Sequence, residues 1–479
     1  MKKLICLLLA VIMTAAAFAG CAGKPEETGT SPAETGNSSY PGKTDDTAAE
    51  SKDQPSNPVD PQVSAQFENL KASDTFTFGT WEQDGKSGSE PITWVVLRQD
   101  VGKMLVLSEK LLEYMCFIAG TEENKYPIGL YKDSDLRAFL NGDFYNKAFT
   151  DDEKAMIQSS VITTNYKDEH YNELTYQTED KVFALSKDEA ARYVCSLGAT
   201  VFGVPTQRVS DENPYKVSSV SGVNGVESAM TWWLRDMGVD SSKYASVITA
   251  NTTRKYNNDD EVYEGGGVRP AMWVVYNAAD AEGYAKGEVK PKEDEQLNAK
   301  IAALKVGSKI QFGVYDNNLY SMDGFETLSW TVIDEDDVSF LILSDTNAGS
   351  SYSVFDKRQD IEDTSWAESY LRAYINSDEF LDMTFTPQEK AKLMLTHIET
   401  SGEDSRDGGA ATDDLLFIPD VNDVEKYSSV FSININAKYW LRSQRSWAPY
   451  IAFASGNGSV SSSNPDKTYA IRLMARIKK

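Results

Sequence analysis

Short apolar runs separated by polar turns dominate most of the chain. The runs 92-ITWVVL-97 and 104-MLVLS-108 are rich in Val, Ile and Leu, and the polar turn between them predicts a β-hairpin. Similar runs return further on, at 232-WWLR-235, 245-ASVITAN-251 and 268-VRPAMWVV-275. The pattern therefore predicts strands at both ends of a region of about 200 residues.

Helix signals occupy the middle of this region. Thr150 to Glu153 and Ser186 to Glu189 have the form of capping boxes, and the second predicts a helix that ends near Gly198. Thr386 to Glu389 repeats the first box and adds a proline at the first helical position. Strands, then short helices, then strands predict an α+β fold with mixed or antiparallel pairing.

The same sequence of motifs occurs twice, in the same order, and its spacing changes only in loops. The matching pairs are 76-FTFG-79 with 310-IQFG-313, 92-ITWVVL-97 with 328-LSWTVI-333, 104-MLVLS-108 with 340-FLILS-344, 136-LRAFLN-141 with 371-LRAYIN-376, 149-FTDDEKA-155 with 385-FTPQEKA-391, 178-TEDKVF-183 with 412-TDDLLF-417, 232-WWLR-235 with 439-YWLR-442, and 267-GVRPAM-272 with 470-AIRLMA-475. We therefore predict two tandem homologous domains, 66–277 and 301–479. The charged segment 278–300 between them reads as a linker.

The first residues have the features of a bacterial lipoprotein signal. Two lysines precede an apolar run too short to be read as a permanent membrane span, and Phe18-Ala19-Gly20-Cys21 resembles a lipobox. That resemblance implies removal of residues 1–20 and acylation of Cys21. Residues 21–65 are rich in Gly, Ser, Thr, Pro and acids, which predicts a disordered tether. The expected location is the outer face of the cytoplasmic membrane, with Cys21 as the lipid anchor.

Charge and cysteine content narrow the choice of partners. The net charge of −26 argues against nucleic acid and against an anionic lipid surface. Cys116 and Cys195 remain once Cys6 and Cys21 are assigned to the signal and the anchor, and they form either a disulfide or two buried thiols. The only histidines are His170 and His397, far apart in the chain, so we expect no metal site and no cofactor.

Arginine stands beside tryptophan in both copies, in strands expected to be buried. Because side chains alternate along a strand, Trp233 and Arg235 share one face. Such arginines either tie strands together through carboxylates and carbonyls or line a cleft that receives a sugar or an anion. The acidic residues that could pair with them include Glu153, Asp180, Glu389 and Asp414. The candidate ligand-binding residues are Trp233, Arg235, Arg269 and Trp273 in the first copy and Trp440, Arg442 and Arg472 in the second.

The motifs 78-FGTWEQ-83, L-R-x-x-L-N, W-L-R and 267-GVRPAMW-273 resemble a bacterial surface domain of unknown function, common in secreted and lipid-anchored proteins of Gram-positive bacteria. The second copy departs from that pattern, with Pro419 read in the place of Ser186, and IRLMA in the place of VRPAM. The ending is similar, more weakly, to C-type-lectin-like domains of the formylglycine-generating-enzyme type. That similarity suggests a fold and no activity.

These features favour a non-catalytic, lipid-anchored extracellular binding protein whose ligand is a surface glycan or a protein. No Ser-His-Asp, Cys-His or phosphate-loop pattern is present, so no catalytic residue is assigned. Two alternatives stay open: an extracellular enzyme acting on a polymer or protein at a site in the first domain, and a structural spacer or assembly module. The variable loops 205–230 and 252–266, with 421–438 and 455–468 in the second copy, are the expected binding or connecting segments.

Overall fold

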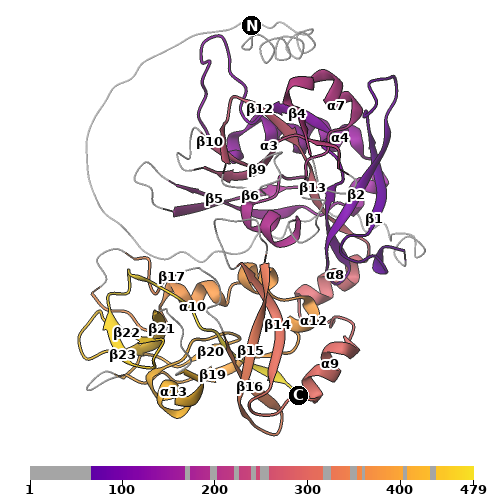
Figure 1. The fold of residues 1–479 in the computed structure, drawn as a ribbon. Helices are drawn as coiled ribbons and strands as arrows, with labels where there is room; N and C mark the ends of the chain where they lie inside the picture. Colours follow the sequence, from indigo (N-terminus) through magenta and orange to yellow (C-terminus); the bar gives the residue numbers. More distant parts are fainter. Residues whose placement is uncertain are drawn as a thin grey trace, which may run out of the picture.

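The computed structural model describes residues 66–167, 173–194, 202–220, 226–238, 244–248, 258–316, 325–345, 353–358, 362–402, 407–431 and 438–479. The predicted signal peptide, Cys21, the tether and Cys195 lie outside these residues. The described chain forms two domains that follow one another in sequence (Figure 1). Among the described residues, no helix is long and apolar enough to cross a membrane.

Two sheets build the first domain. One is antiparallel, with the order β1-β2-β3-β13, and the other has the order β11-β10-β9-β12-β4, in which only the β12–β9 pair is parallel. The strands are β1 (Thr75–Trp81), β2 (Glu90–Gln99), β3 (Lys103–Ser108), β4 (Glu113–Cys116), β9 (Trp232–Met237), β10 (Tyr244–Ile248), β11 (Asn258–Glu261), β12 (Gly265–Val268) and β13 (Ala271–Val275). Side chains of β9 are buried on both faces: Trp233 packs in one apolar cluster, and Trp232 and Leu234 pack in another.

Short helices and hairpins complete this domain. The helices are α3 (Asp135–Phe139), α4 (Tyr145–Ala148), α5 (Asp151–Met156), α6 (Lys187–Glu189) and α7 (Gln207–Glu212), with 3-10 turns at Tyr131–Asp133 and Pro214–Lys216 and π-helical turns at Leu140–Phe144 and Ala190–Val194. The paired strands are β5 (Ser160–Lys167) with β6 (Glu173–Asp180), and β7 (Ser218–Ser219) with β8 (Ser228–Ala229). Both predicted capping boxes, at Thr150 and at Ser186, are confirmed.

The second domain repeats the plan. Its main sheet has the order β14-β15-β16-β25-β18, and a three-stranded sheet has the order β21-β22-β23. The strands are β14 (Lys309–Asp316), β15 (Phe325–Glu335), β16 (Ser339–Ser344), β17 (Ser353–Val354), β18 (Leu393–Met394), β19 (Thr396–Ile398), β20 (Thr412–Asp414), β21 (Lys438–Gln444), β22 (Ile451–Ser455), β23 (Val460–Ser463), β24 (Thr468–Tyr469) and β25 (Met474–Lys478). The helices are α10 (Tyr370–Ile375), α11 (Asp378–Thr384), α12 (Pro387–Lys390), α13 (Val421–Lys426) and α14 (Ser428–Phe431). The predicted α+β class, with mostly antiparallel sheets, is confirmed.

Equivalent side chains of the two domains make equivalent contacts. The Trp94 indole donates to the carbonyl of Phe78 over 2.7 Å, and the Trp330 indole donates to the carbonyl of Phe312 over 2.6 Å. Both tryptophans are fully buried. In each domain a glycine with positive φ, Gly79 or Gly313, follows that carbonyl residue at a bulge of the first hairpin.

A set of polar contacts, formed by an arginine, an asparagine and an aspartate, is also repeated in both domains. Arg137 Nε lies 2.7 Å from Asp180 Oδ1, and Arg372 Nε lies 2.7 Å from Asp414 Oδ1. The side-chain amide of Asn141 forms hydrogen bonds with the backbone of the two residues that follow Asp180. In the second domain, the side-chain amide of Asn376 does the same with the two residues that follow Asp414. These repeated contacts extend the duplication from sequence to three-dimensional structure.

The segment 278–300 joins the domains through helices rather than as extended chain alone. It contains α8 (Ala278–Ala285) and most of α9 (Glu295–Ala302). Leu297 and Ile301 of α9 pack in the core of the second domain, as Phe67 packs in the core of the first. The core of the second domain thus includes a residue, Leu297, that precedes the predicted boundary at position 301.

The domains also contact each other directly at the C-terminal end of α11. Arg192 Nε donates to the carbonyl of Met383 over 2.7 Å, and Arg98 donates to the carbonyl of Asp382 and lies 3.5 Å from its carboxylate. The Met383 side chain packs against an apolar cluster of the first domain. Two arginines of one copy therefore satisfy the last carbonyls of a helix in the other.

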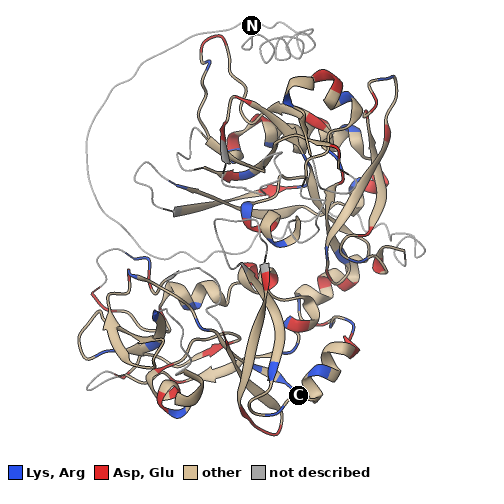
Figure 2. Cartoon of the chain, in the orientation of Figure 1, with Lys and Arg blue, Asp and Glu red and all other residues tan. Residues whose placement is uncertain are grey.

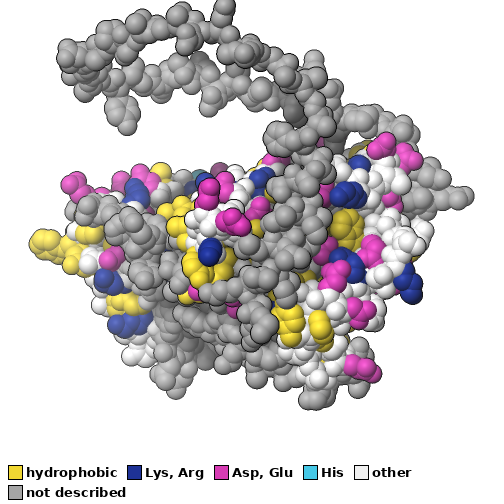
Figure 3. All heavy atoms as spheres, turned by 90° about the horizontal axis from the view of Figure 1, so that it is seen from above, with side chains coloured by type: hydrophobic (Ala, Val, Ile, Leu, Met, Phe, Trp, Pro, Cys, Tyr) yellow, Lys and Arg dark blue, Asp and Glu magenta, His cyan; other side chains and the backbone are white. Residues whose placement is uncertain are grey.

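Charges of both signs are interspersed over the ribbon of both domains, as Figure 2 shows. The view from above in Figure 3 likewise shows acidic, basic and hydrophobic side chains mixed on one face. Neither view shows acidic side chains gathered into one patch among the described residues, so the figures indicate no single surface for a cationic partner.

Candidate functional site

Arg235 is an internal tie of the first domain. The residue is 3 % exposed, and its guanidinium forms a forked ion pair with the Glu189 carboxylate. It also donates to the carbonyls of Thr163 and Ala184, each over 3.0 Å. The charge of Glu189 raises the pKa of Arg235 against the opposing effect of burial.

Arg442 is the corresponding internal tie of the second domain. It pairs with Asp420 over 3.1 Å and with Asp423 over 2.8 Å, and it donates to the carbonyl of Ile418. Asp420 and Asp423 also form the capping box of α13. The expectation that Pro419 replaces Ser186 is therefore wrong by one position: Asp420 supplies the cap, so the second copy keeps it with a different residue type.

Arg269, just before β13, and Arg472, just before β25, bind backbone carbonyls at the ends of β3 and β16. The guanidinium of Arg269 donates to the carbonyls of Ser108 and Glu109, over 2.8 and 3.1 Å, and lies over the Trp232 ring. Arg472 donates twice to the carbonyl of Ser344 and lies over the rings of Phe431 and Tyr439. Burial lowers the pKa of Arg269 to about 9, which leaves the side chain charged at neutral pH.

The candidate tryptophans are also packed inside. Trp233 is 1 % exposed and donates to the carbonyl of Met115 over 2.9 Å, and Trp440 is fully buried against Phe355 and Tyr469. Trp273 is half-buried, with the Lys103 ammonium over its ring. Six of the seven candidates are buried and bonded or packed inside their domain, and Trp273 is half-buried, so this geometry favours the internal-tie interpretation over a ligand cleft.

The acids expected to pair with these arginines serve other groups. Glu153 and Glu389 accept from the backbone N–H of Gly79 and Gly313, whereas Asp180 and Asp414 pair with the helix arginines. The partners are instead the capping acids Glu189, Asp420 and Asp423. Cys116 is buried, and the choice between a disulfide with Cys195 and two buried thiols is untested because Cys195 lies outside the described residues.

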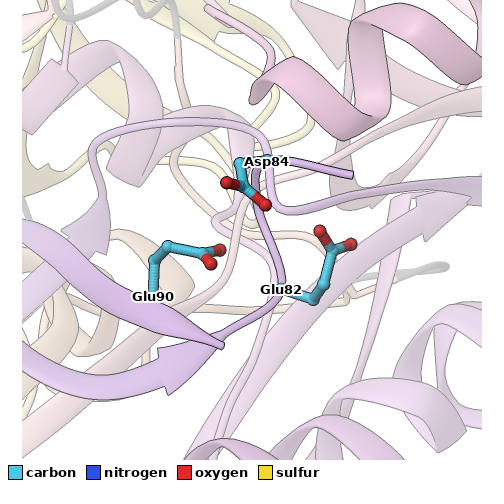
Figure 4. A group of neighbouring side chains, drawn as sticks. All are labelled: Glu82, Asp84 and Glu90. Carbon is cyan, nitrogen blue, oxygen red and sulfur yellow. The ribbon is translucent and has the colours of Figure 1, made fainter. Parts of the chain in front are cut away.

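Three carboxylates face a common space on the β1–β2 connection, as Figure 4 shows: Glu82, Asp84 and Glu90. Each could offer one ligand oxygen to a metal ion, since these atoms lie within 4.8 Å of one another. The three groups also have internal donors. Glu82 pairs with Arg208 over 2.6 Å, Asp84 pairs with Lys86 over 2.9 Å, and Glu90 accepts from the backbone of Gln83. Proximity of acids alone does not establish a cation site.

A polar pocket of about 560 Å³ opens in the second domain. Its walls come from the segment before α10, from a glycine turn before β20, and from the end of β21. The lining residues are Asp363, Thr364, Ser365, Ala367, Glu368, Asp407, Gly409, Ala410 and Gln444. The volume suits a small polar ligand or one unit of a polymer.

Gln444 is the buried polar group of this pocket. The residue is 5 % exposed, and its Nε2 donates to the carbonyl of Thr364 over 2.6 Å and to Asp363 Oδ1 over 3.3 Å. Because both partners are acceptors, the orientation of the amide is fixed. Its Oε1 accepts no hydrogen bond from the described residues, and the side chain lines the pocket. This oxygen is not one of the buried side-chain atoms that lack a partner, so it is an acceptor that a ligand in the pocket could use.

The glycine turn sets the width of the pocket. Gly408 and Gly409 both have positive φ, and a Cβ built at Gly409 would lie 2.5 Å from Ser365 Cβ and 2.9 Å from its Oγ. Only glycine therefore fits between the two walls without a shift.

A family model matches residues 101–276 and 337–479, which together make up more than half of the chain. Its description is Domain of unknown function (DUF6273). The chain belongs to this family. No curated protein and no solved structure gives a significant match. The two matched regions confirm two copies of one domain of unknown function.

The first DUF6273 copy has larger apolar or aromatic side chains at positions equivalent to three residues of the pocket lining. The two domains can be aligned on their shared arginines and aspartates. In this alignment Met237 is equivalent to Gln444, Leu130 to Ser365, and Tyr176 to Ala410. Met237, Leu130 and Tyr176 belong to or pack against the apolar core of the first domain. The pocket is thus a feature in which the two copies differ.

Sequence reasoning missed this pocket because it searched for shared residues. Gln444 stands two residues after the repeated WLR motif, and the equivalent position in the first domain is Met237. A methionine-to-glutamine difference at a buried strand position was the available signal, since burying an amide is costly unless it has partners.

Proposed function

We propose that this protein is a non-catalytic, lipid-anchored binding protein of the cell surface, and that its second domain holds an extracellular glycan in the Gln444 pocket. The observation that carries the proposal is the polar cavity of about 560 Å³, lined by the side chain of Gln444, whose amide is held in place by Thr364 and Asp363. Sugar hydroxyls have the size and polarity that suit such a lining.

Exposed aromatic side chains that follow Gln444 closely in the chain support a sugar ligand. Trp447 is 78 % exposed and Tyr450 is 40 % exposed, on the turn between β21 and β22 that begins directly after Gln444. Three residues of chain span at most about 10 Å, so Trp447 lies within reach of one sugar unit beyond the pocket. An exposed indole offers an apolar face and one donor, which suits stacking on a pyranose ring.

A substitution in the glycine turn tests the pocket. Gly409→Ala is expected to weaken binding of a glycan found on an array by about tenfold or more, because the new methyl group meets Ser365 and narrows the pocket. Isothermal titration calorimetry on the purified full chain in detergent measures this loss. Gly307→Ala is the matched control, since Gly307 also has positive φ but nothing lies within 4 Å of its added Cβ.

Equal affinities of Gly409→Ala and the wild-type protein would contradict a role for the pocket. Retention on no glycan or wall polymer would contradict the proposed function as a whole. Release of shortened products from a bound glycan would favour the enzymatic alternative instead, and chromatography of the incubated glycan detects it.

Anchoring through Cys21 is the second part of the proposal, and the lipobox-like Phe18–Cys21 supports it. In a bacterial host, Cys21→Ser is expected to abolish incorporation of labelled fatty acid and to move the protein out of the detergent-extracted membrane fraction. Cys6→Ser, within the apolar run, is the control and should leave labelling unchanged. Labelled fatty acid on the Cys21→Ser protein would contradict the assignment.

A further inference from the structure

The buried polar side chains that line the pocket of the second domain are neutral. Ser365 is 7 % exposed and Gln444 is 5 % exposed, and both belong to the lining. The carboxylates of the lining come from exposed positions, at Asp363, Glu368 and Asp407. Water screens charges at such positions, so pairing with them contributes little to affinity. The neutral buried groups therefore decide which ligand the pocket selects.

Two of the carboxylates already hold the walls of the pocket. Asp363 Oδ1 accepts from the backbone N–H of Thr364 over 2.8 Å, and Asp407 Oδ1 accepts from the backbone N–H of Gly409 over 3.0 Å. The hydroxyl of Thr364 is committed as well, because it donates to Asp356 Oδ2 over 2.8 Å. These groups shape the pocket through contacts inside the protein.

The Ser365 hydroxyl is the side-chain donor left for a ligand. It makes no hydrogen bond with the described residues, and it is not one of the buried side-chain atoms that lack a partner, so it is open to the pocket. Gln444 Oε1 is an open acceptor for the same reason, and the bond from Nε2 to the carbonyl of Thr364 fixes its direction.

The open donor and the open acceptor come from different walls. Ser365 lies in the segment before α10, whereas Gln444 ends β21. A ligand group placed between these walls can therefore be bonded on two edges, provided that it offers one acceptor and one donor.

An acetamido group has this form. Its carbonyl accepts one hydrogen bond, its N–H donates another, and its methyl group is apolar. Ala367 and Ala410 contribute methyl groups to the lining against which the acetyl methyl can pack. An ammonium group would leave the Ser365 donor without an acceptor, and a carboxylate would leave Gln444 Oε1 without a donor.

We infer that the second domain selects glycans that carry N-acetyl groups. The Ser365 hydroxyl donates to the carbonyl of the acetamido group, and Gln444 Oε1 accepts from its N–H. This inference rests on the proposed function and specifies the ligand class of the same pocket.

The test compares three β-1,4-linked hexamers that differ only at carbon 2: N-acetylglucosamine, glucosamine and glucose. Calorimetry on the full chain in detergent at pH 7 is expected to give at least about tenfold tighter binding of the acetylated hexamer, because only this probe serves both open groups. Raising the salt concentration should change that affinity by less than about twofold, since the paired groups are uncharged.

Ser365→Ala is expected to weaken binding of the acetylated hexamer by about fivefold to tenfold, because it removes one hydrogen bond to the ligand. Affinity for the glucose hexamer should stay the same, so the preference shrinks. The matched control is Ser462→Ala, an exposed serine of β23 outside the lining. Unchanged affinity of the Ser365→Ala protein, or an equal loss in the control, would overturn the inference.

Equal or tighter binding of the glucosamine or glucose hexamer to the wild-type protein would overturn the acetamido inference and leave the glycan-binding proposal standing. Binding of none of the three, together with retention of a glycan that has no N-acetyl group, would have the same meaning. If no glycan is retained at all, the proposed function fails first and the inference fails with it.

Discussion

Replacing Glu189 by alanine is expected to destabilise the first domain by about 3–5 kcal/mol. The variant leaves the guanidinium of Arg235 buried without its forked carboxylate partner, and an uncompensated buried charge is among the costliest defects in a folded protein. It also removes the capping box at Ser186, whose backbone N–H donates to Glu189 over 2.9 Å. The midpoint of chemical unfolding, followed by hydrogen exchange of the first-domain strands, measures the loss.

Glu153→Ala separates the two contributions. Glu153 forms the capping box of α5 and accepts from Gly79, but it has no arginine partner among the described contacts. This control is expected to cost only about 1–2 kcal/mol, the usual cost of a lost cap and one further hydrogen bond. Similar losses for Glu153→Ala and Glu189→Ala would refute the view that the buried ion pair is the larger contribution.

The duplication could be predicted from sequence because packed interiors constrain residue type. Trp94 and Trp330 donate to equivalent carbonyls, and Gly79 and Gly313 need the same positive φ, so these positions kept their identities in both copies. Their repetition in one order is enough to predict two domains from the sequence. The helix caps at Thr150 and Thr386 are local, and local patterns are read directly from sequence.

The partners of the arginines could not be predicted in the same way. Arg235 pairs with a residue 46 positions earlier, and several acids were equally compatible with the sequence. The carboxylates that proved to be partners also cap helices, so a capping motif beside a buried arginine is a usable signal for this pairing. Chain topology decides which of many distant acids comes near, and a single sequence does not contain it.

The pocket escaped prediction for the opposite reason. It lies where the copies differ, at Gln444 against Met237 and at Ser365 against Leu130. Residues shared by the two domains indicate the fold, because both domains need them to form it. The residues that line the pocket differ between the two domains, so a search for shared residues does not find them. Within a duplicated protein, the positions that stop matching are therefore the better guide to function.

Removal of either buried tryptophan is expected to have a second large effect, and a parallel one. Trp94→Ala and Trp330→Ala should each destabilise their own domain by about 3–5 kcal/mol, because each removes a fully buried ring and leaves the carbonyl of Phe78 or Phe312 without its indole donor. Hydrogen exchange resolved along the chain should show faster opening first in β1–β3 for Trp94→Ala and first in β14–β16 for Trp330→Ala.

Trp447→Ala is the control for this pair, since the side chain is 78 % exposed and its loss should change stability by less than about 0.5 kcal/mol. The contacts of Arg98 and Arg192 with the end of α11 add a further expectation. Opening of the second domain breaks these bonds, so Trp330→Ala should also accelerate exchange near Arg192 in the first domain, while Trp447→Ala should not. Unchanged exchange near Arg192 would mean that the two domains open independently despite their contact. Losses of stability that differ by several kcal/mol between Trp94→Ala and Trp330→Ala would show that the two equivalent positions do not contribute equally.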